Sequence, residues 1–329
     1  MTEVPAHPFA VLTPDFLLAA VEAQGLVCDG RLTALNSYEN RVYQVGIEDG
    51  EPLIAKFYRP GRWSDAQITE EHDFCVELAA LELPVVAPLP GADGAMLRHY
   101  QDLRFALFPR RGGRAPELDC PNTLVTLGRT LGRIHSAGAV RPFRHRERLD
   151  AHSRGHHSIE LIAEDFIPAG LRAAYASVAR EVLARVEAAF AALPDIAWIR
   201  SHGDCHPGNL LWRDTAPHFV DFDDAAMAPA IQDLWMLLSG ERAQAELQLA
   251  ELMAGYLEFH DFDPRELRLI EPLRALRIIH YAAWLARRSD DPAFLQAFPW
   301  FNTERYWGEH ILALREQLAA LAEPPLRLL

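Results

Sequence analysis

Lysine is almost absent from this chain: of the 32 basic residues among its 329 positions, 31 are arginine and one, Lys56, is lysine. Arginine replaces lysine wherever only a positive surface charge is needed, so a composition that favours arginine removes most lysines. A compact ammonium differs from the planar guanidinium in tasks such as contacting phosphate oxygens. Lys56 is therefore either an accident of composition or a functional residue, and its neighbours must decide between the two.

The chain also has few cysteines, an excess of acidic side chains and no long apolar run. Its four cysteines include no Cys-x-x-Cys pair, so neither a disulfide framework nor a zinc ribbon is indicated. With 46 acidic against 32 basic residues the net charge is −14, which excludes a general binder of nucleic acid or of an anionic membrane, because such binding needs clustered cations. The sequence shows neither a charge-free apolar stretch of about 18 residues nor a leader-like N-terminus. We therefore expect a soluble cytoplasmic protein that binds any anionic ligand in a local site.

The first hundred residues have the apolar and polar alternation of β-strands. Strands are predicted at 32–36, 41–47, 52–58, 85–90, 95–100 and 103–108, and a helix at 66–81. A linker is expected at 109–113, after which the pattern becomes helical, with amphipathic helices at 122–137 and 168–193. The chain thus predicts an α+β, bilobal protein with a strand-rich N-terminal lobe (1–110), a mainly helical C-terminal lobe (111–329) and a ligand cleft between them.

A run of basic side chains occupies residues 141–157, where five arginines and four histidines crowd a short segment without helical periodicity. Such a run can dock an acidic partner or a phosphate. A solvated loop is the favoured interpretation, because most charge runs simply face water.

A dense polar segment interrupts the helical part of the chain at residues 199–224. It reads His202-Gly-Asp204-Cys-His206-Pro-Gly-Asn209 and continues, after a short apolar run, to Asp221. In phosphotransferases of the kinase type, an Asp accepts the proton of the acceptor hydroxyl, an Asn five residues later holds Mg²⁺, and a further Asp after a strand and turn binds the same metal. Asp204, Asn209 and Asp221 have this order and spacing, and their oxygen atoms suit a hard cation.

Lys56 lies where this chemistry needs a lysine. Strand alternation puts Ile54 and Lys56 on one face and Leu53, Ala55 and Phe57 on the other. In the helix that follows, Glu71 shares an apolar stripe with Ile68 and Cys75 and is predicted to point inward, toward Lys56. Glu70, about 100° away around the helix, is the alternative partner and is expected to be solvated. The lysine is therefore predicted to contact nucleotide phosphates.

Several segments together resemble a known family: residues 35–44, 55–60, 202–209 with 211–214, and 233–238. They are similar to the aminoglycoside phosphotransferase and choline kinase branch of the protein-kinase-like fold, and within it to the bacterial stress response kinase A family of Ser/Thr protein kinases. The resemblance covers most of the chain. It implies that Asp204 is the proton acceptor, that Asn209 and the catalytic Asp221 hold Mg²⁺, and that Lys56 contacts the phosphates of ATP.

The chain also departs from the protein-kinase pattern. No Gly-x-Gly-x-x-Gly precedes Lys56, so the turn at 36–40 must cover the phosphates, and Ser37 is the residue expected to contact them. Gly203 replaces the arginine of the protein-kinase catalytic loop, and no glycine follows Asp221-Phe222-Asp223. The segment 225–232 is too short for a long activation loop, so regulation by phosphorylation of such a loop is not expected.

Other interpretations of the polar residues stay open. His202-x-Asp204-x-His206 is also the start of some metallohydrolase sites, although that interpretation leaves Lys56 and Asn209 unexplained. His202 is expected to be structural rather than an acid or base. Asp233 is expected to brace the catalytic loop, and Asp223 either assists the metal or shapes the turn.

The leading hypothesis is an ATP- and Mg²⁺-dependent Ser/Thr protein kinase that acts in a stress response. Its partners are ATP and a protein substrate, with no nucleic acid or membrane, and it is expected to be a monomer and a phosphoprotein. The alternative is a small-molecule kinase acting on an aminoglycoside, choline or homoserine, for which Glu304 or Glu309 could line a cationic pocket. A non-catalytic scaffold is disfavoured because all four predicted site residues are present.

Overall fold

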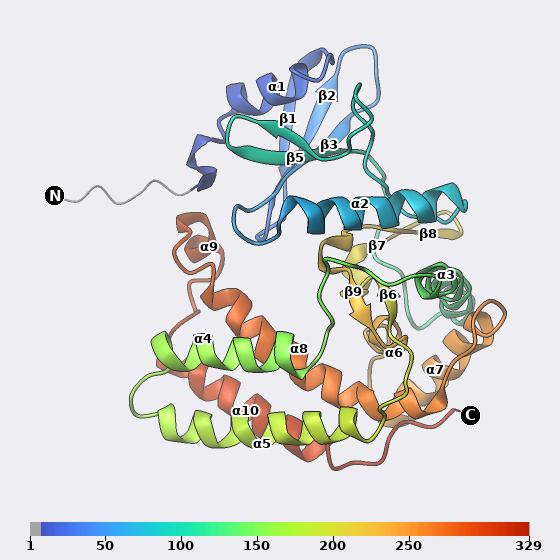
Figure 1. The fold of residues 1–329 in the computed structure, drawn as a ribbon, viewed down its shortest axis with the longest axis vertical. Coiled ribbons are helices and arrows are strands. Elements are labelled where there is room, and N and C mark those ends of the chain that lie inside the picture. The colour runs from blue at the N-terminus through green and yellow to red at the C-terminus, as the bar shows by residue number, and fades with distance from the viewer. Residues whose placement is uncertain (1–7, 329) are drawn as a thin grey trace. The chain divides into compact units, whose positions relative to one another are not determined.

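The computed structural model describes residues 8–328, which form two compact units (Figure 1). The first unit contains the chain up to Pro116 together with Arg144–Arg146 and Gly208–Asp223, and the second contains Glu117–Phe143, Glu147–Pro207 and the rest of the chain from Asp224. The units do not coincide with the predicted division after residue 110, because two later segments belong to the strand-rich unit. Local patterns cannot show onto which unit a distant hairpin packs.

The first unit is built on an antiparallel sheet of five strands in the order β1-β2-β3-β5-β4. The strands are β1 (Cys28–Leu35), β2 (Arg41–Ile47), β3 (Leu53–Phe57), β4 (Arg98–Tyr100) and β5 (Leu103–Pro109). Lys56 on β3 stands opposite Val42 of β2 and Ala106 of β5, so it lies on a strand paired along both edges. The predicted strands at 41–47, 52–58 and 103–108 are confirmed.

Helices cover the two faces of this sheet (Figure 1). On one face, α1 (Pro14–Glu22) packs its buried side chains into a core with Ala55 and Phe57 of β3. On the other, Ile68 of α2 (Asp65–Ala80) packs with Tyr58 and Ala106. Ser64 begins α2 with a capping box, since its side chain accepts the backbone N–H of Gln67. The predicted alternation along β3 is confirmed, and it turns Lys56 toward the α2 face.

The predicted strand at 85–90 is wrong. Only an isolated bridge, Val85 with Phe219, occurs there, and the segment is otherwise irregular. Pro84, Pro88 and Pro90 lack the backbone N–H that a strand ladder requires. The predicted strand at 95–100 is also shortened, to the three residues of β4.

The bridge at Val85 attaches a second hairpin to the first unit. This hairpin consists of β7 (Leu210–Arg213) and β8 (Ala216–Phe219), joined by a two-residue turn in which Asp214 has a φ of 56°. Val86 donates its N–H to the carbonyl oxygen of Phe219 over 2.9 Å, and Phe219 donates to that of Pro84 over 2.8 Å. The hairpin carries Asn209 at its start and Asp221 at its end.

The second unit is mainly helical. Its helices are α3 (Pro121–Ala139), α4 (His157–Asp165), α5 (Arg172–Ala191), α6 (Ile231–Trp235), α7 (Arg242–Tyr256), α8 (Ile270–Ala286), α9 (Pro292–Ala297) and α10 (Glu304–Ala320), and its one small sheet pairs β6 (Ile199–Ser201) with β9 (Ala226–Ala228). The helix α8 packs against α4, α5 and α10 (Figure 1). A Cβ on Gly128 of α3 would lie 1.9 Å from the carbonyl oxygen of Leu252 in α7, so the close packing of these two helices requires glycine there.

Among residues 8–328, no helix combines the length and the apolar character needed to cross a membrane.

Candidate active site

In the first unit, the single lysine is held between two carboxylates. Lys56 Nζ lies 2.8 Å from Asp221 Oδ1 and 3.1 Å from Asp223 Oδ1, and only 8% of the lysine side chain is exposed. Burial alone lowers the pKa of Lys56, but the carboxylates of Asp221, Asp223 and Glu71 outweigh burial and hold the pKa well above its usual value. The ammonium is therefore charged at neutral pH and suited to an anionic ligand.

The β7–β8 hairpin brings two oxygen ligands to the same end. The backbone N–H of Val220 donates to the carbonyl oxygen of Asn209 over 3.1 Å, so Asn209 and Asp221 flank the open end of the hairpin. Asp221 has a φ of 61°, and 52% of its side chain is exposed. An amide oxygen and an exposed carboxylate are ligands that Mg²⁺ prefers, so these residues fit the predicted metal. Of the four principal predicted residues, Lys56, Asn209 and Asp221 thus belong to one unit.

The turn that precedes β2 is fixed by an arginine that sequence reasoning missed. Arg59 donates its backbone N–H to Asn40 Oδ1 over 3.0 Å, and its guanidinium donates to the carbonyl oxygens of Tyr38 (3.1 Å) and Glu39 (2.9 Å). Ser37 lies in this turn and is half-buried. Arg59 belongs to the segment 55–60 that supports the family resemblance, but no pattern in that segment predicts a contact with the turn.

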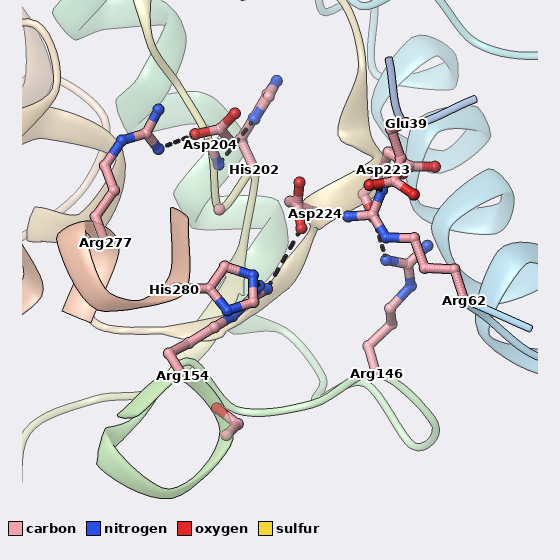
Figure 2. A network of polar contacts seen from close by, with 12 residues as sticks. Glu39, Arg62, Arg146, Arg154, His202, Asp204, Asp223, Asp224, Arg277 and His280 are labelled. Atoms are coloured by element: carbon pink, nitrogen blue, oxygen red, sulfur yellow. Dashed lines mark hydrogen bonds and ion pairs between the residues drawn. The ribbon is translucent and has the colours of Figure 1, made fainter. Parts of the chain in front are cut away.

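A second arginine, also missed, connects this turn to the hairpin. Arg62 Nη1 lies 2.9 Å from Glu39 Oε2 and 2.5 Å from Asp223 Oδ2 (Figure 2). Asp223 is buried and is shared between Arg62 and Lys56. This arrangement favours the interpretation that Asp223 shapes the site through ion pairs.

Glu71 differs from its prediction in one respect. It is buried and points inward as expected, but its ion pair is with Arg146 Nη2, at 2.8 Å, whereas the ion pairs of Lys56 are with Asp221 and Asp223. Burial raises the pKa of Glu71 to about 7, against the opposing effect of Lys56 and Arg146. The predicted direct ion pair between Lys56 and Glu71 is thus absent, because the carboxylates of Asp221 and Asp223 lie closer to the ammonium. Glu71 acts on Lys56 only through its negative charge, without direct contact.

Glu70 is not simply solvated, because it accepts the backbone N–H groups of residues 144, 145 and 146 over 2.5, 2.8 and 2.8 Å. These bonds hold the basic segment against α2. Arg146 itself donates to the carbonyl oxygens of Asp223 (2.6 Å) and Gln67 (2.8 Å). The interpretation of 141–157 as a solvated loop is therefore wrong for Arg146. It is also wrong for Arg154, which is buried in the second unit.

In the second unit, the loop that carries Asp204 is braced by a buried aspartate. Asp233 accepts the backbone N–H groups of His202 (2.7 Å) and Gly203 (2.9 Å) and lies 3.1 Å from His135 Nε2. Burial alone raises the pKa of Asp233, but the hydrogen bonds from His135 and Gly203 outweigh burial and hold the pKa below its usual range. The bracing expected of Asp233 is present, and His135 is an unpredicted part of it.

Two features of this loop explain the residues around Asp204. Gly203 has a φ of 83°, and a Cβ there would lie 2.1 Å from the carbonyl oxygen of Asp224, so no side chain fits where protein kinases carry arginine. His202 is fully buried, and its Nδ1 accepts the backbone N–H of Asp204 over 3.4 Å. This contact agrees with the structural role expected of His202.

The carboxylate of Asp204 has neighbours on both oxygens. The guanidinium of Arg277, from α8, donates to Asp204 Oδ1 (Figure 2). His206 Nε2 lies 3.5 Å from Asp204 Oδ2. Sequence reasoning missed Arg277, because no motif links α8 to the loop 73 positions earlier.

The two acidic residues considered for a cationic pocket, Glu304 and Glu309, have different surroundings in the structure. Glu309 lines a cavity of about 450 Å³ in the second unit, and it forms an ion pair of 2.8 Å with Arg305. Glu304 is exposed at the start of α10. The other lining residues of the cavity are Ile278, Tyr281, Trp300, Tyr306, His310 and Ala313.

Solved structures with this fold are kinases and phosphotransferases. The chain is similar to the amicoumacin kinase hAmiN in complex with AMP-PNP, Ca²⁺ and Ami (TM-score 0.72, 19% identity, 94% of each chain covered) and to a microcompartment-associated aminopropanol kinase (TM-score 0.69, 18% identity, 95% of this chain and 99% of that one). A spectinomycin phosphotransferase in complex with ADP and spectinomycin is also similar (TM-score 0.65, 16% identity, 92% and 98% covered). The chain therefore has the kinase-like fold of these three proteins.

Sequence comparison is more specific. The profile of the Phosphotransferase enzyme family (APH) matches residues 31–270. Stress response kinase A of Escherichia coli (strain K12) and the serine/threonine protein kinase RdoA of Salmonella typhimurium (strain LT2) are each 45% identical to this chain over 324 residues, which is 98% of both chains in each pair. The chain belongs to the phosphotransferase enzyme family and, within it, to the stress response kinase A family.

Proposed function

We propose that this protein is an ATP- and Mg²⁺-dependent kinase that transfers the γ-phosphoryl group of ATP to Ser or Thr hydroxyls of a protein in a stress response. The observation that carries the proposal is the buried, charged Lys56 beside Asp221 at the end of a hairpin that also bears Asn209. The name of one 45% identical relative, stress response kinase A, supports a stress-response role, and the name of the other, the serine/threonine protein kinase RdoA, supports a protein acceptor.

In the first unit, Lys56 binds the phosphates of ATP, and Asn209 and Asp221 hold Mg²⁺. The metal, when bound, balances the negative charge of the phosphates. Asp221, whose side chain is half exposed, would supply a carboxylate oxygen to the metal, while Asp223 pairs with Arg62. Ser37 and the backbone of its turn contact the phosphates in place of a glycine-rich loop.

In the second unit, Asp204 orients the acceptor hydroxyl and accepts its proton. The hydroxyl oxygen forms a bond to the γ-phosphorus while the bond from that phosphorus to the β–γ bridging oxygen breaks, and ADP leaves with the electron pair. Asp233 and His135 fix the loop that presents Asp204. Positioning and charge balance supply the catalysis, because the reaction needs no covalent enzyme intermediate.

A small-molecule acceptor is the second candidate. The structural neighbours are named for amicoumacin, aminopropanol and spectinomycin, and Glu309 lines a cavity in the second unit. The same four residues serve either acceptor, so the acceptor must be determined by experiment.

The test uses radiolabelled ATP and Mg²⁺ with the full chain alone, with casein, and with a panel of choline, aminopropanol, homoserine and spectinomycin. Labelling of casein or of the chain itself is the expected result, and it would also identify a phosphoprotein. Labelling of only a small molecule would replace the protein acceptor by the second candidate, and nucleotide binding without any transfer would contradict both. Asp204→Ala is expected to abolish labelling while ATP binding, measured by titration calorimetry, stays close to that of the wild type.

We further propose that the protein acts in the cytoplasm as a monomer. Its mass on gel filtration with light scattering is expected to be near the 37.0 kDa of one chain, and a mass near twice that value would contradict the monomer.

A further inference from the structure

The contact between Arg277 and Asp204 joins two residues of the second unit that are 73 positions apart. Arg277 lies in the middle of α8, and its Nη1 contacts both Asp204 Oδ1 and, at 3.8 Å, the sulfur of Met236. Its side chain is 43% exposed. The guanidinium therefore covers one oxygen of the proposed proton acceptor from the solvent side.

Arg277 keeps most of its hydrogen-bonding capacity. A guanidinium has five N–H donors, and both contacts are made through Nη1. Within the described range 8–328, Nε and Nη2 of Arg277 have no protein partner. A second anion can therefore bind the exposed side of this guanidinium in a bidentate manner.

The preceding arginine of α8, Arg274, has different contacts from Arg277. Arg274, one turn earlier, has a similar exposure of 39%, but its Nη1 is bound to the carboxylate of Glu271 at 2.9 Å, and its guanidinium lies 5.3 Å from the ring centre of Trp235. The positive charge of Arg274 is thus balanced by Glu271 of the same helix. The positive charge of Arg277 is balanced by Asp204, the carboxylate that the proposed reaction needs.

The two oxygens of Asp204 are both engaged before an acceptor arrives. Arg277 holds Oδ1, and His206 lies near Oδ2. An acceptor hydroxyl that donates to Oδ1 must compete with a charge-assisted hydrogen bond, which is stronger than one between neutral groups. An acceptor that carries its own anion can draw the guanidinium away, but a cationic acceptor can only be repelled by it.

We propose that Arg277 is a specificity-determining residue that binds an anionic group of the acceptor, a carboxylate or phosphate close to the reactive hydroxyl, and thereby frees Asp204. This inference rests on the proposed role of Asp204 in the kinase reaction. It defines the substrate class as hydroxyl groups in an acidic setting, such as Ser or Thr beside Asp, Glu or a phosphorylated residue. An enzyme that acts on polycationic acceptors would not be expected to place an arginine beside its proton acceptor, because the arginine repels such acceptors.

The first test compares three peptides that differ only in the residues flanking one Ser: Glu, Ala or Lys. For the wild type, kcat/KM is expected to be highest with the Glu peptide. In Arg277→Met, kcat/KM for the Glu peptide should fall about tenfold, the effect of one charge-assisted hydrogen bond. The Ala peptide should react faster, because Asp204 is no longer covered. Arg277→Lys should retain part of the preference, and the matched control Arg274→Met should behave as the wild type.

The second test needs no turnover. Binding of the Glu peptide with Ala in place of Ser is measured by titration calorimetry, and the wild type is expected to bind it about tenfold more tightly than Arg277→Met does. Equal affinity, or no detectable binding to the wild type, would overturn the inference. A uniform loss of rate with all three peptides and with water as acceptor would also overturn it, since Arg277 would then act on the transferred phosphoryl group or on the fold.

A failure of the proposed kinase function and a failure of the proposed role of Arg277 give different results. If the wild type transfers phosphate to no hydroxyl at all, the proposed function is wrong, and the calorimetric comparison still decides whether Arg277 binds an acidic peptide. If transfer occurs without any dependence on flanking charge, the kinase assignment survives and the role of Arg277 does not. Thermal unfolding of each variant by circular dichroism identifies any loss of fold.

Discussion

Lys56 Nζ and Asp221 Oδ1 lie 2.8 Å apart although 165 positions separate the two residues in the chain. The lysine is buried on a central strand, whereas the aspartate is half exposed at the end of a hairpin. The pair therefore combines a buried cation held in one position with an anion whose side chain has room to turn. We expect this combination where the cation binds a nucleotide and the anion binds a metal ion.

Replacing the lysine by arginine tests whether the shape of the cation matters. Lys56→Arg keeps the charge, but the planar guanidinium is larger and does not fit the same space between Asp221 and Asp223. We expect phosphoryl transfer to fall by about 100-fold or more, comparable with the loss of one charge-stabilising donor in other active sites. Transfer is measured with radiolabelled ATP. Turnover equal to that of the wild type would show that Lys56 has no function that requires a lysine.

The ion pairs of Arg62 lead to a prediction about nucleotide affinity. Arg62→Met removes the connection between Glu39, in the turn that carries Ser37, and Asp223. The turn should become more mobile, because only the contacts of Arg59 then hold it, and the Kd for ATP should rise about tenfold, because ordering the turn costs part of the binding energy. Arg31→Met is the matched control, since Arg31 pairs only locally with Asp29 on an exposed strand. An unchanged Kd in Arg62→Met would show that the connection is structural only.

The buried pair of Arg146 and Glu71 leads to a prediction about stability. Arg146→Met leaves the Glu71 carboxylate buried without its partner, so the free energy of unfolding should fall by about 3–5 kcal/mol. The double variant Glu71→Met, Arg146→Met should recover part of this loss, because it leaves no unpaired charge. Urea denaturation measures both, and Arg144→Met, at an exposed position of the same segment, should change little. A loss no larger than that of the control would contradict the prediction.

His310 leads to a prediction about pH. Burial lowers the pKa of His310 to about 4, so the folded protein binds fewer protons there than the unfolded chain between about pH 6.5 and 4. The free energy of unfolding should therefore decrease as the pH falls through this window, by at most about 3 kcal/mol for this residue. His310→Phe, which keeps an aromatic ring beside Tyr175, should reduce that slope. Parallel slopes for the wild type and His310→Phe would refute the assignment.

The sequence predicted the local features of the site and missed the long-range ones. The strand that carries Lys56 and the inward direction of Glu71 follow from periodicity, which is set by near neighbours in the chain. The partner of Glu71, and the contacts of Arg62 and Arg277, depend on which segments meet after folding. In a chain with 31 arginines, no pattern marks the few that are buried or that face a catalytic residue.

Lys56 on β3 acquires both of its carboxylate partners only when residue 223 has left the ribosome, because the first unit includes Gly208–Asp223. A nascent chain of 116 residues can form the sheet but holds Lys56 without Asp221 and Asp223. A loop of this length is costly to close and slow to form. The strand-rich first unit is thus expected to mature late in synthesis, together with the helical second unit, rather than as an N-terminal domain that folds first.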